Sequence, residues 1–442
     1  MTLSFKDDRL TQLLFANDER ADVADERFRL DSIALVVTID DAAVRTDWGQ
    51  AAAMALAVCG SRMFRGGVFL RQIPEVPAQF GTRVGQPLRR ALEDLGCRAS
   101  GEAPKSALRL HIGHAGNGQD LHITARGWTA SVTPKASALQ PASSNVVVGV
   151  LAAAIAVGEA FRRLALRAPD ACRVPQIVNA WQPGFIEEPE GAIARLPTAL
   201  WLLGAGNLGQ AILFLLSMLP FADRRAVTLF VQDNDRSGPE NLSTQVLTSH
   251  SWLGRKKAAA ASAHMEALGF TAYAIERRFT NRQGPSAGEP RIALVGVDNE
   301  EARLAAATAG FDLVLDSGLG GTPAQIFDLE FHAFPGATPA EKIWIGDKRQ
   351  NSEKLVPERY RRLVELGVID ACGMTTVAGQ AVGVPATALA AAALQVAQLC
   401  RALATNSYCD AIDLRLARCS DSAASLYENA GLSLEMLAPA CS

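Results

Sequence analysis

Apolar and polar positions along the first part of the chain predict strands and helices in alternation. Runs of apolar, β-branched residues indicate strands, and longer stretches with a helical repeat of apolar positions indicate helices. In chain order these patterns give a strand at 33–39, a helix at 47–63, a strand at 67–70, two hairpin-like strands at 107–112 and 121–124, and an Ala-rich helix at 146–164. A strand–helix–strand beginning predicts an α/β fold with a largely parallel sheet.

The second part of the chain repeats this order. Residues 198–203 predict a strand, residues 208–219 a helix, and residues 226–231 a second strand. Val148-Gly149-Val150 and Val382-Gly383-Val384 are similar, and each opens an Ala-rich helix. Because internal repeats fix an architecture, we expect two related α/β units. Chance similarity between two Ala-rich helices is the alternative.

Length, charge and cysteine content narrow the class of protein. A chain of 442 residues is longer than a single core usually becomes, so two or more domains are expected. The net charge of −3 gives no reason to expect nucleic acid or a membrane as partner. None of the 8 cysteines forms a CxxC pair, and the first residues lack the apolar core of a signal peptide. We expect a cytoplasmic protein without structural zinc, and read the apolar runs at 146–160 and 381–400 as buried helices.

A glycine-rich turn follows the predicted strand at 198–203. It reads Gly204-Ala-Gly206-Asn207-Leu-Gly209 and leads into a predicted helix. In such a turn the first glycine permits a tight bend, the second lets a phosphate approach the backbone, and the third lets helix and strand pack closely. The helix N-terminus adds N–H groups that favour an anion. We interpret the turn as a nucleotide-binding loop; a purely structural turn is the alternative.

Polar residues follow the later strands of the second part. Asp233 and Asp235 come after the strand at 226–231, where a carboxylate can accept hydrogen bonds from both hydroxyl groups of a ribose. This much fits a nicotinamide-dependent dehydrogenase equally well. The polar series then continues with Glu240-Asn241-Leu242-Ser-Thr244-Gln245, Gly254-Arg-Lys-Lys257 and Val297-Asp298-Asn299, the last followed by Arg303. A dehydrogenase explains neither Asn241 nor the Asp298-Asn299 pair.

In order and type, these motifs resemble the ubiquitin-activating enzyme family, including its ThiF and MoeB type. That family shows a glycine loop, an Asp-x-Asp, an Asn-Leu-x-Arg-Gln, a Gly-x-x-Lys, and an Asp-Asn followed by an arginine. The resemblance covers residues 198–335 well and 370–402 more loosely. It implies a bacterial activating enzyme with a Rossmann-like ThiF-type adenylation domain over 191–442. A degenerate, inactive adenylation-like α/β domain would precede it over 1–190, where the glycine loop is missing.

The resemblance implies ATP and Mg²⁺ as ligands and assigns roles to the matching residues. Asp233 would bind the ribose, Lys257 would neutralise the triphosphate, and Asp298 would coordinate magnesium. Asn241 would contact phosphates or hold the loop. The other implied nucleotide contacts are Gly204, Gly206, Asn207, Gly209, Asp235 and Gln245. Plain alternatives exist: Lys257 as a solvated helix residue, Asp298 as a strand-end turn, and Asn241 as a helix cap.

One position departs from the family pattern. Thr244 stands where the family usually has the arginine of Asn-Leu-x-Arg-Gln, so a phosphate contact is missing or comes from elsewhere. In the family an arginine can reach in from the partner copy. The charged N-terminal segment offers Arg9, Arg20, Arg27 and Arg29, and the sequence does not choose among them. The departure also keeps a non-catalytic, regulatory adenylation-like subunit open as an alternative.

A cysteine near the last long helix is the candidate nucleophile for a second step. Residues 334–371 are read as a crossover loop over the site, and Cys372 follows, shortly before Gly379 and the Ala-rich helix. Related enzymes often place a reactive cysteine at such a point, where it would form a thioester from the acyl-adenylate. A buried cysteine without chemistry is the alternative. Oxyester formation at Ser352, Thr375 or Thr376 is a further one.

Together these inferences predict an enzyme that adenylates the C-terminal tail of a ubiquitin-like protein with ATP. Cys372 would then accept the acyl group and transfer it to a ubiquitin-conjugating-enzyme-like protein. A sulfur-carrier adenylyltransferase is a close alternative, although the extra N-terminal half and the lack of zinc cysteines argue against it. If the first half replaces a second subunit, a homodimer is possible but is not needed to complete a site.

Overall fold

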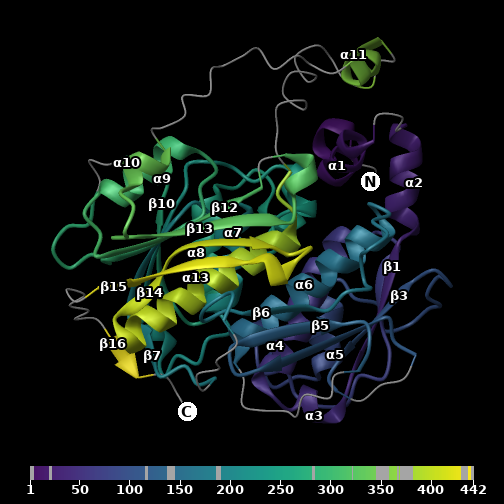
Figure 1. The fold of residues 1–442 in the computed structure, drawn as a ribbon, viewed down its shortest axis with the longest axis horizontal. Helices are drawn as coiled ribbons and strands as arrows, with labels where there is room; N and C mark the ends of the chain where they lie inside the picture. Colours follow the sequence, from purple (N-terminus) through teal and green to yellow (C-terminus); the bar gives the residue numbers. More distant parts are fainter. Residues whose placement is uncertain are drawn as a thin grey trace.

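The computed structural model describes most of the chain as an α/β protein with two parallel-rich sheets. The described residues are 4–18, 22–114, 118–136, 145–185, 191–280, 284–320, 322–344, 358–365, 368, 382–429 and 437–439. The two α/β units lie side by side, and the N-terminal helices lie at one end of the first unit (Figure 1). This arrangement agrees with the α/β fold and the two-unit organisation that the hydrophobic pattern predicts.

A 3₁₀ helix and two short α-helices precede the first sheet. The 3₁₀ helix η1 (Phe5–Asp7) leads into α1 (Arg9–Asn17), and α2 (Val23–Ser32) runs into the first strand. Both α-helices begin at an aspartate cap: the side chain of Asp8 accepts from Thr11 N, and that of Asp22 accepts from Ala24 N and Asp25 N. Such caps satisfy amide groups that have no partner within the helix.

The first sheet has the strand order β2-β1-β3-β4-β5-β6. Its strands are β1 (Ala34–Ile39), β2 (Gly67–Leu70), β3 (Leu108–Ile112), β4 (Leu121–Arg126), β5 (Thr129–Thr133) and β6 (Gln176–Asn179). Its helices are α3 (Asp41–Val44), α4 (Asp47–Met63), α5 (Leu88–Asp94) and α6 (Val146–Leu164). The predicted strands at 33–39 and 67–70 and both long helices are confirmed.

The predicted hairpin between residues 107–112 and 121–124 is wrong. The two strands pair in parallel, with Leu110 opposite Leu121 and Ile112 opposite Ile123. The antiparallel neighbour of β4 is instead β5, three residues further along the chain. The apolar pattern identifies strands but carries no information on their direction, and the short polar connection at 113–120 imitates a hairpin loop.

The second sheet has the strand order β10-β9-β8-β11-β12-β13-β14-β15. The strands are β8 (Ala199–Leu203), β9 (Thr228–Gln232), β10 (Thr271–Ile275), β11 (Ile292–Val295), β12 (Leu313–Leu319), β13 (Asp328–Phe334), β14 (Ser407–Arg415) and β15 (Ala423–Glu428). The strands from β10 to β12 pair in parallel, and β13 to β15 continue antiparallel. A small separate sheet pairs β7 (Arg195–Pro197) with β16 (Leu437–Pro439).

The helices of the second unit are α7 (Asn207–Leu216), α8 (Lys257–Ala267), α9 (Glu300–Thr308), α10 (Ala340–Trp344), α11 (Glu358–Glu365) and α13 (Pro385–Thr405). Of these, α13 packs against α7 of its own unit and against α6 of the first unit. It is long and apolar enough to span a membrane, but the protein buries it completely. The run at 381–400 is therefore a buried core helix over its described part, as the sequence predicted.

One large hydrophobic cluster is shared by the two units. The largest cluster of buried apolar residues extends from the N-terminal helices through both sheets to β14. The same kind of contact occurs in both units. Gly149 lies against Trp48 at the start of α4, and Gly383 lies against Asn207 at the start of α7. These matching contacts agree with a tandem relationship between the two halves.

Candidate functional site

The predicted nucleotide loop lies at the carboxyl edge of the second sheet. Leu203, the last residue of β8, is in register with Gln232 of β9 and with Val295 of β11. The segments that continue these strands therefore leave the sheet side by side. They carry the glycine loop, Asp233 and Asp298, so these predicted residues share one edge.

Two glycines of the loop are required by the backbone. Gly204 has φ +91°, and a Cβ there would lie 2.9 Å from the carbonyl oxygen of Gly296. A Cβ on Gly209 would lie only 1.8 Å from the carbonyl oxygen of Gly204. Gly206, the N-cap of α7, has open space where a Cβ would be. Gly204 and Gly209 therefore serve the fold, and Gly206 leaves room for a ligand at the helix N-terminus.

Asp233 is fixed against the glycine loop. Its Oδ2 accepts a hydrogen bond from Ala205 N at 2.7 Å, and its Oδ1 accepts from Asp235 N at 2.7 Å. Each carboxylate oxygen can accept more than one hydrogen bond. The side chain is thus held in one orientation beside the loop and retains acceptor capacity for hydroxyl groups.

Lys257 is a buried cation at the same edge. It begins α8, and its Nζ lies 3.2 Å from Oδ2 of the exposed Asp235. Its backbone N–H donates to the carbonyl of Asp235 at 2.9 Å. The lysine side chain is only 11% exposed, which argues against a merely solvated helix residue. A lysine held by a single exposed carboxylate can exchange that partner for a phosphate.

Asn241 and Gln245 support the backbone around the site. Asn241 Oδ1 accepts from Gly238 N at 2.9 Å and closes the 3₁₀ helix η4 (Pro239–Ser243). Gln245 Oε1 accepts from Gln210 Nε2 of α7 at 2.7 Å and from Thr248 Oγ1 at 3.0 Å. The observed contact of Asn241 is therefore the helix-cap contact that was the plain alternative for this residue. Gln245 holds α7, the helix that follows the glycine loop.

Asn207 links the glycine loop to the start of α13. Its Nδ2 donates to the carbonyl of Val384 at 3.5 Å, and a Cβ on Gly383 would lie 2.8 Å from the same nitrogen. Its Oδ1 is buried and has no hydrogen-bond partner among the described residues. Asn207 thus sits where the loop meets the segment that follows the predicted crossover.

Asp298 is exposed beyond the end of β11, directly after Val297, whose carbonyl accepts from Arg303. Arg303 donates to the carbonyls of Val297 at 3.2 Å and Ser317 at 3.3 Å, and lies 3.6 Å from Asp316. Burial raises the pKa of Asp316 to about 6, although Arg303 opposes this shift. Arg303 therefore connects the ends of β11 and β12. The sequence pattern marks Arg303, but the partnership with Asp316 gives no signal in the sequence.

The carboxylates at this edge of the second sheet are suitable ligands for a magnesium ion that is bound together with phosphates. Magnesium prefers hard oxygen ligands and commonly takes one or two protein carboxylates besides waters and substrate phosphates. Asp298 supplies an exposed carboxylate, and Asp235 lies at the same edge. No group of three or more His, Cys, Asp or Glu that could hold a metal alone occurs among the described residues. The chemistry fits a metal that arrives with its nucleotide.

The predicted nucleophile lies outside the described residues. Cys372, the rival residues Ser352, Thr375 and Thr376, and residues 345–357, 366–367 and 369–371 of the predicted crossover loop fall there. The described cysteines are Cys59, Cys97, Cys172, Cys400, Cys409 and Cys419. Burial raises the pKa of each of these thiols, for example to about 12 for Cys400 and about 11 for Cys409. They are poor nucleophiles, because the thiolate is the reactive form.

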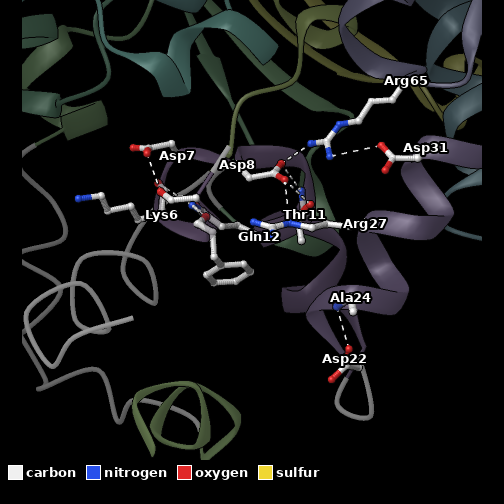
Figure 2. Close-up of polar contacts among 12 residues, drawn as sticks. Lys6, Asp7, Asp8, Thr11, Gln12, Asp22, Ala24, Arg27, Asp31 and Arg65 are labelled. Carbon is white, nitrogen blue, oxygen red and sulfur yellow. Dashed lines mark hydrogen bonds and ion pairs between the residues drawn. The ribbon is translucent and has the colours of Figure 1, made fainter. Parts of the chain in front are cut away.

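Arg9, one of the candidate N-terminal arginines, begins α1, the helix that contacts η4. Burial lowers the pKa of Arg9, while the carboxylates of Glu240 in η4 and of Asp7 act in the opposite direction. The other described candidates have different partners: Arg27 pairs with Asp8, as Figure 2 shows, and Arg29 pairs with Glu26. Arg20 lies outside the described residues.

The matching edge of the first sheet carries its own anion. Asp40 follows β1, and its side chain accepts from Ala43 N at 2.6 Å and from His114 N at 2.8 Å. A Cβ on Gly113 would lie 1.9 Å from Asp40 Oδ2, so this carboxylate is tightly enclosed. Backbone N–H groups at a turn can bind an external anion. Here the Asp40 carboxylate already accepts hydrogen bonds from these groups.

Two hollows lie away from the nucleotide loop. One, of about 140 Å³, lies between the units, lined by Met54, Phe80 and Arg83 from the first and by Phe214, Met218 and His264 from the second. The other, of about 560 Å³, lies beside α9 and α10 and is lined by residues such as Phe311, Phe334 and Glu341.

The fold and the glycine edge define a two-unit α/β protein with a glycine-rich strand-to-helix turn in its second unit. Comparison with known proteins gives the particular family. The family models of the BilD N-terminal and C-terminal domains match residues 34–179 and 196–406. The bacterial E1-like protein BilD of Collimonas sp. (strain OK412) is 34% identical over 366 residues, which are 80% of this chain and 79% of that protein. The chain therefore belongs to the BilD family of bacterial E1-like proteins.

Solved structures add little to this assignment. The match to TcdA (CsdL) has 16% sequence identity and a TM-score of 0.21, and it covers 24% of this chain and 42% of that one. A similarity this low supports no argument about mechanism. The E1-like assignment rests on the BilD comparison, which agrees with the predicted family at the level of E1-like proteins.

Proposed function

We propose that this chain is an ATP-dependent activating enzyme, an adenylyltransferase for the C-terminal tail of a ubiquitin-like protein. The observation that carries the proposal is the pair of contacts Ala205–Asp233 and Lys257–Asp235, which join three separate segments at one sheet edge. Asp298 leaves the neighbouring strand at that edge. An anion-binding helix end, a buried lysine and exposed carboxylates together suit a nucleoside triphosphate with magnesium.

In the proposed reaction the tail carboxylate attacks the α-phosphorus of ATP. The bond to the pyrophosphate group breaks, so the products are an acyl-adenylate and pyrophosphate. The N-terminus of α7 and Lys257 stabilise negative charge on the phosphates, and Asp233 holds the ribose. Magnesium held through Asp298 would neutralise charge on the phosphates.

Arg9 is the proposed substitute for the arginine missing at Thr244. It begins α1, which contacts η4, the 3₁₀ helix that carries Asn241 and ends just before Thr244. An arginine there adds a fork of donors that matches phosphate oxygens. It would come from the N-terminal half of the same chain, so a homodimer, although possible, is not needed.

The second proposed step is thioester formation at Cys372. Its thiolate would attack the carbonyl carbon of the acyl-adenylate, forming a carbon–sulfur bond and releasing AMP. A ubiquitin-conjugating-enzyme-like protein would then take the acyl group by thioester exchange. The raised thiol pKa of each described cysteine supports the choice of Cys372 over these six.

The proposed division of labour places the active adenylation domain at 191–442 and the inactive one at 1–190. The enclosed Asp40 carboxylate supports an edge without nucleotide in the first half. A non-catalytic regulatory subunit is the second candidate, and the observation that favours it is Thr244.

ATP–pyrophosphate exchange in the presence of a candidate ubiquitin-like tail tests the proposal. We expect exchange by the wild-type chain and a loss of about 100-fold in Asp298→Ala, the size seen when one charge-stabilising group is removed. Asp413→Ala is the control, because Asp413 is exposed on β14, three strands from β11. Tail-independent ATP binding without any exchange would favour the regulatory candidate.

A further inference from the structure

The N-terminal helix α1 contacts both halves of the protein. Its buried face carries Leu10, Leu13, Leu14 and Phe15, and it packs against η4 and against η7 (Pro323–Gln325) of the second unit. Asn17 Nδ2 also donates to the carbonyl of Pro323 at 3.2 Å. A helix of nine residues is marginal in isolation, so its position depends on such contacts.

Asp8 ties this helix to the first unit. Its side chain is only 2% exposed and accepts from Thr11 N at 3.1 Å and Thr11 Oγ1 at 2.7 Å. Arg65, in the turn between α4 and β2, donates to Asp8 Oδ1, and Arg27 Nε of α2 lies 3.5 Å from Asp8 Oδ2. Figure 2 shows both arginines directed at this carboxylate.

Arg9, the next residue, is placed by the same arrangement. Arg9 Nη1 donates to Gln12 Oε1 at 3.4 Å, while Gln12 Nε2 donates to the carbonyls of Phe5 at 2.7 Å and Lys6 at 2.8 Å. Phe5 is buried and meets Phe15 edge to face, with ring centroids 5.6 Å apart. Contacts within the N-terminal segment therefore hold the chain around Arg9 in place, and Asp8 attaches this segment to Arg65 and Arg27.

We propose that Asp8, with Arg65 and Arg27, forms a latch that positions Arg9 at the nucleotide edge of the other half. A buried carboxylate needs its cationic partners, and both partners belong to the first unit. α1 also contacts η4, the segment that carries Glu240 and Asn241. Asp8 is thus a positioning residue for the adenylation site, and this inference rests on the proposed function.

The latch makes ATP recognition depend on the first half of the chain. Release of Asp8 would let α1 move away from η4 and withdraw Arg9 from the phosphates. Because Arg9 is expected to contact the bound triphosphate, its displacement raises KM for ATP more than it lowers kcat. A general loss of folded protein would lower the apparent kcat instead.

Asp8→Asn and Arg65→Gln in the full chain test the latch. Asparagine retains the helix cap but removes the charge that holds both arginines. Arg65 and Arg27 are 24% and 27% exposed, so water can solvate them in the Asp8→Asn variant. The matched control is Asp31→Asn, since Asp31 is 64% exposed and lies 3.9 Å from Arg65.

We expect Asp8→Asn and Arg65→Gln to raise KM for ATP about tenfold in pyrophosphate exchange with kcat within about twofold, a loss of the size expected for one charged hydrogen bond. Hydrogen exchange of residues 5–17 should rise in both variants and stay unchanged in Asp31→Asn. The double variant Asp8→Asn/Arg9→Ala should be no worse than Arg9→Ala alone, because the two residues act in series.

Two outcomes overturn different claims. A wild-type chain that shows neither ATP binding nor exchange refutes the proposed function, and the latch with it. A wild-type chain that exchanges normally, with Asp8→Asn equal to Asp31→Asn in KM or fully additive with Arg9→Ala, refutes the latch alone.

Discussion

At the scale of single residues, we expect two glycines of the loop to have different roles, Gly209 in folding and Gly206 in ligand binding. Gly209 touches the carbonyl of Gly204, whereas Gly206 faces open space. We expect Gly209→Ala to destabilise the protein by about 1–3 kcal/mol, because the added methyl group overlaps backbone. Gly206→Ala should unfold like wild type yet bind ATP more weakly, since its methyl group lies where a phosphate would approach. Urea unfolding and ATP titration measure the two effects, and equal destabilisation by both variants would contradict this division.

Asp316 makes stability depend on pH. Burial raises the pKa of Asp316 from 3.8 to about 6, so the folded state holds this proton more tightly than the unfolded state. Its stabilising contribution is full below about pH 4 and is lost as pH rises through 6, and the shift corresponds to about 3 kcal/mol. The Asp316→Asn variant has no ionisable group at this position, so its stability lacks this pH dependence.

We therefore expect the unfolding free energy of wild type, relative to Asp316→Asn, to fall between pH 4 and pH 7. Urea unfolding of both proteins across this range measures the difference. A difference that rises with pH would mean that the ion pair with Arg303 outweighs burial.

At the scale of elements, α13 is held by two buried glutamines. Gln395 Nε2 donates to Val295 O of β11 at 2.9 Å. Gln398 Nε2 donates to Ala180 O of the first unit at 2.9 Å, and its Oε1 accepts from Cys409 N at 2.8 Å. The helix is thereby fixed to the strand that leads to Asp298 and to the neighbouring unit.

Gln398→Leu should cost about 2–5 kcal/mol, because it leaves a buried N–H and a buried C=O without partners. Thr405→Val is a suitable control at the end of the same helix, where the Thr405 hydroxyl is near solvent. Thermal unfolding of both variants measures the cost. Equal midpoints would show that α13 is held by apolar packing alone.

Local patterns predicted the elements but not their pairing. The strands at 33–39 and 67–70 and the glycine turn follow from β-branched runs and glycine spacing, and the structure has all three. The hairpin at 107–124 failed because strand direction is set by the whole sheet. The contact of Asp8 with Arg65 joins positions 57 residues apart, and no local pattern encodes it. At the site, the motifs marked the glycine loop, Asp233 and Lys257, whose contacts the structure describes but whose nucleotide roles stay predictions; the proposal of Arg9 among the arginines drew on the contact of α1 with η4.

At the scale of the whole molecule, the two halves are joined by apolar and polar contacts. The main hydrophobic cluster crosses their boundary, and polar contacts cross it as well. Arg62, near the end of α4, donates from Nε to Gln245 O at 2.8 Å and from Nη2 to Thr248 O at 3.2 Å. The Gln245 side chain in turn accepts from Gln210 on α7. The first half thus supports the helix that follows the glycine loop.

Arg62→Ala should therefore impair both stability and ATP binding. It leaves the buried carbonyls of Gln245 and Thr248 without this donor, at a cost of about 1–3 kcal/mol each. Arg45→Ala is the control, because Arg45 forms an exposed pair with Asp41 that contributes at most about 1 kcal/mol. Unfolding followed by tryptophan fluorescence and ATP titration of the folded protein separate the two effects. If the halves were independent, Arg62→Ala would weaken the first unit without changing ATP affinity; loss of affinity at full folding means that the first half helps to shape the nucleotide edge of the second.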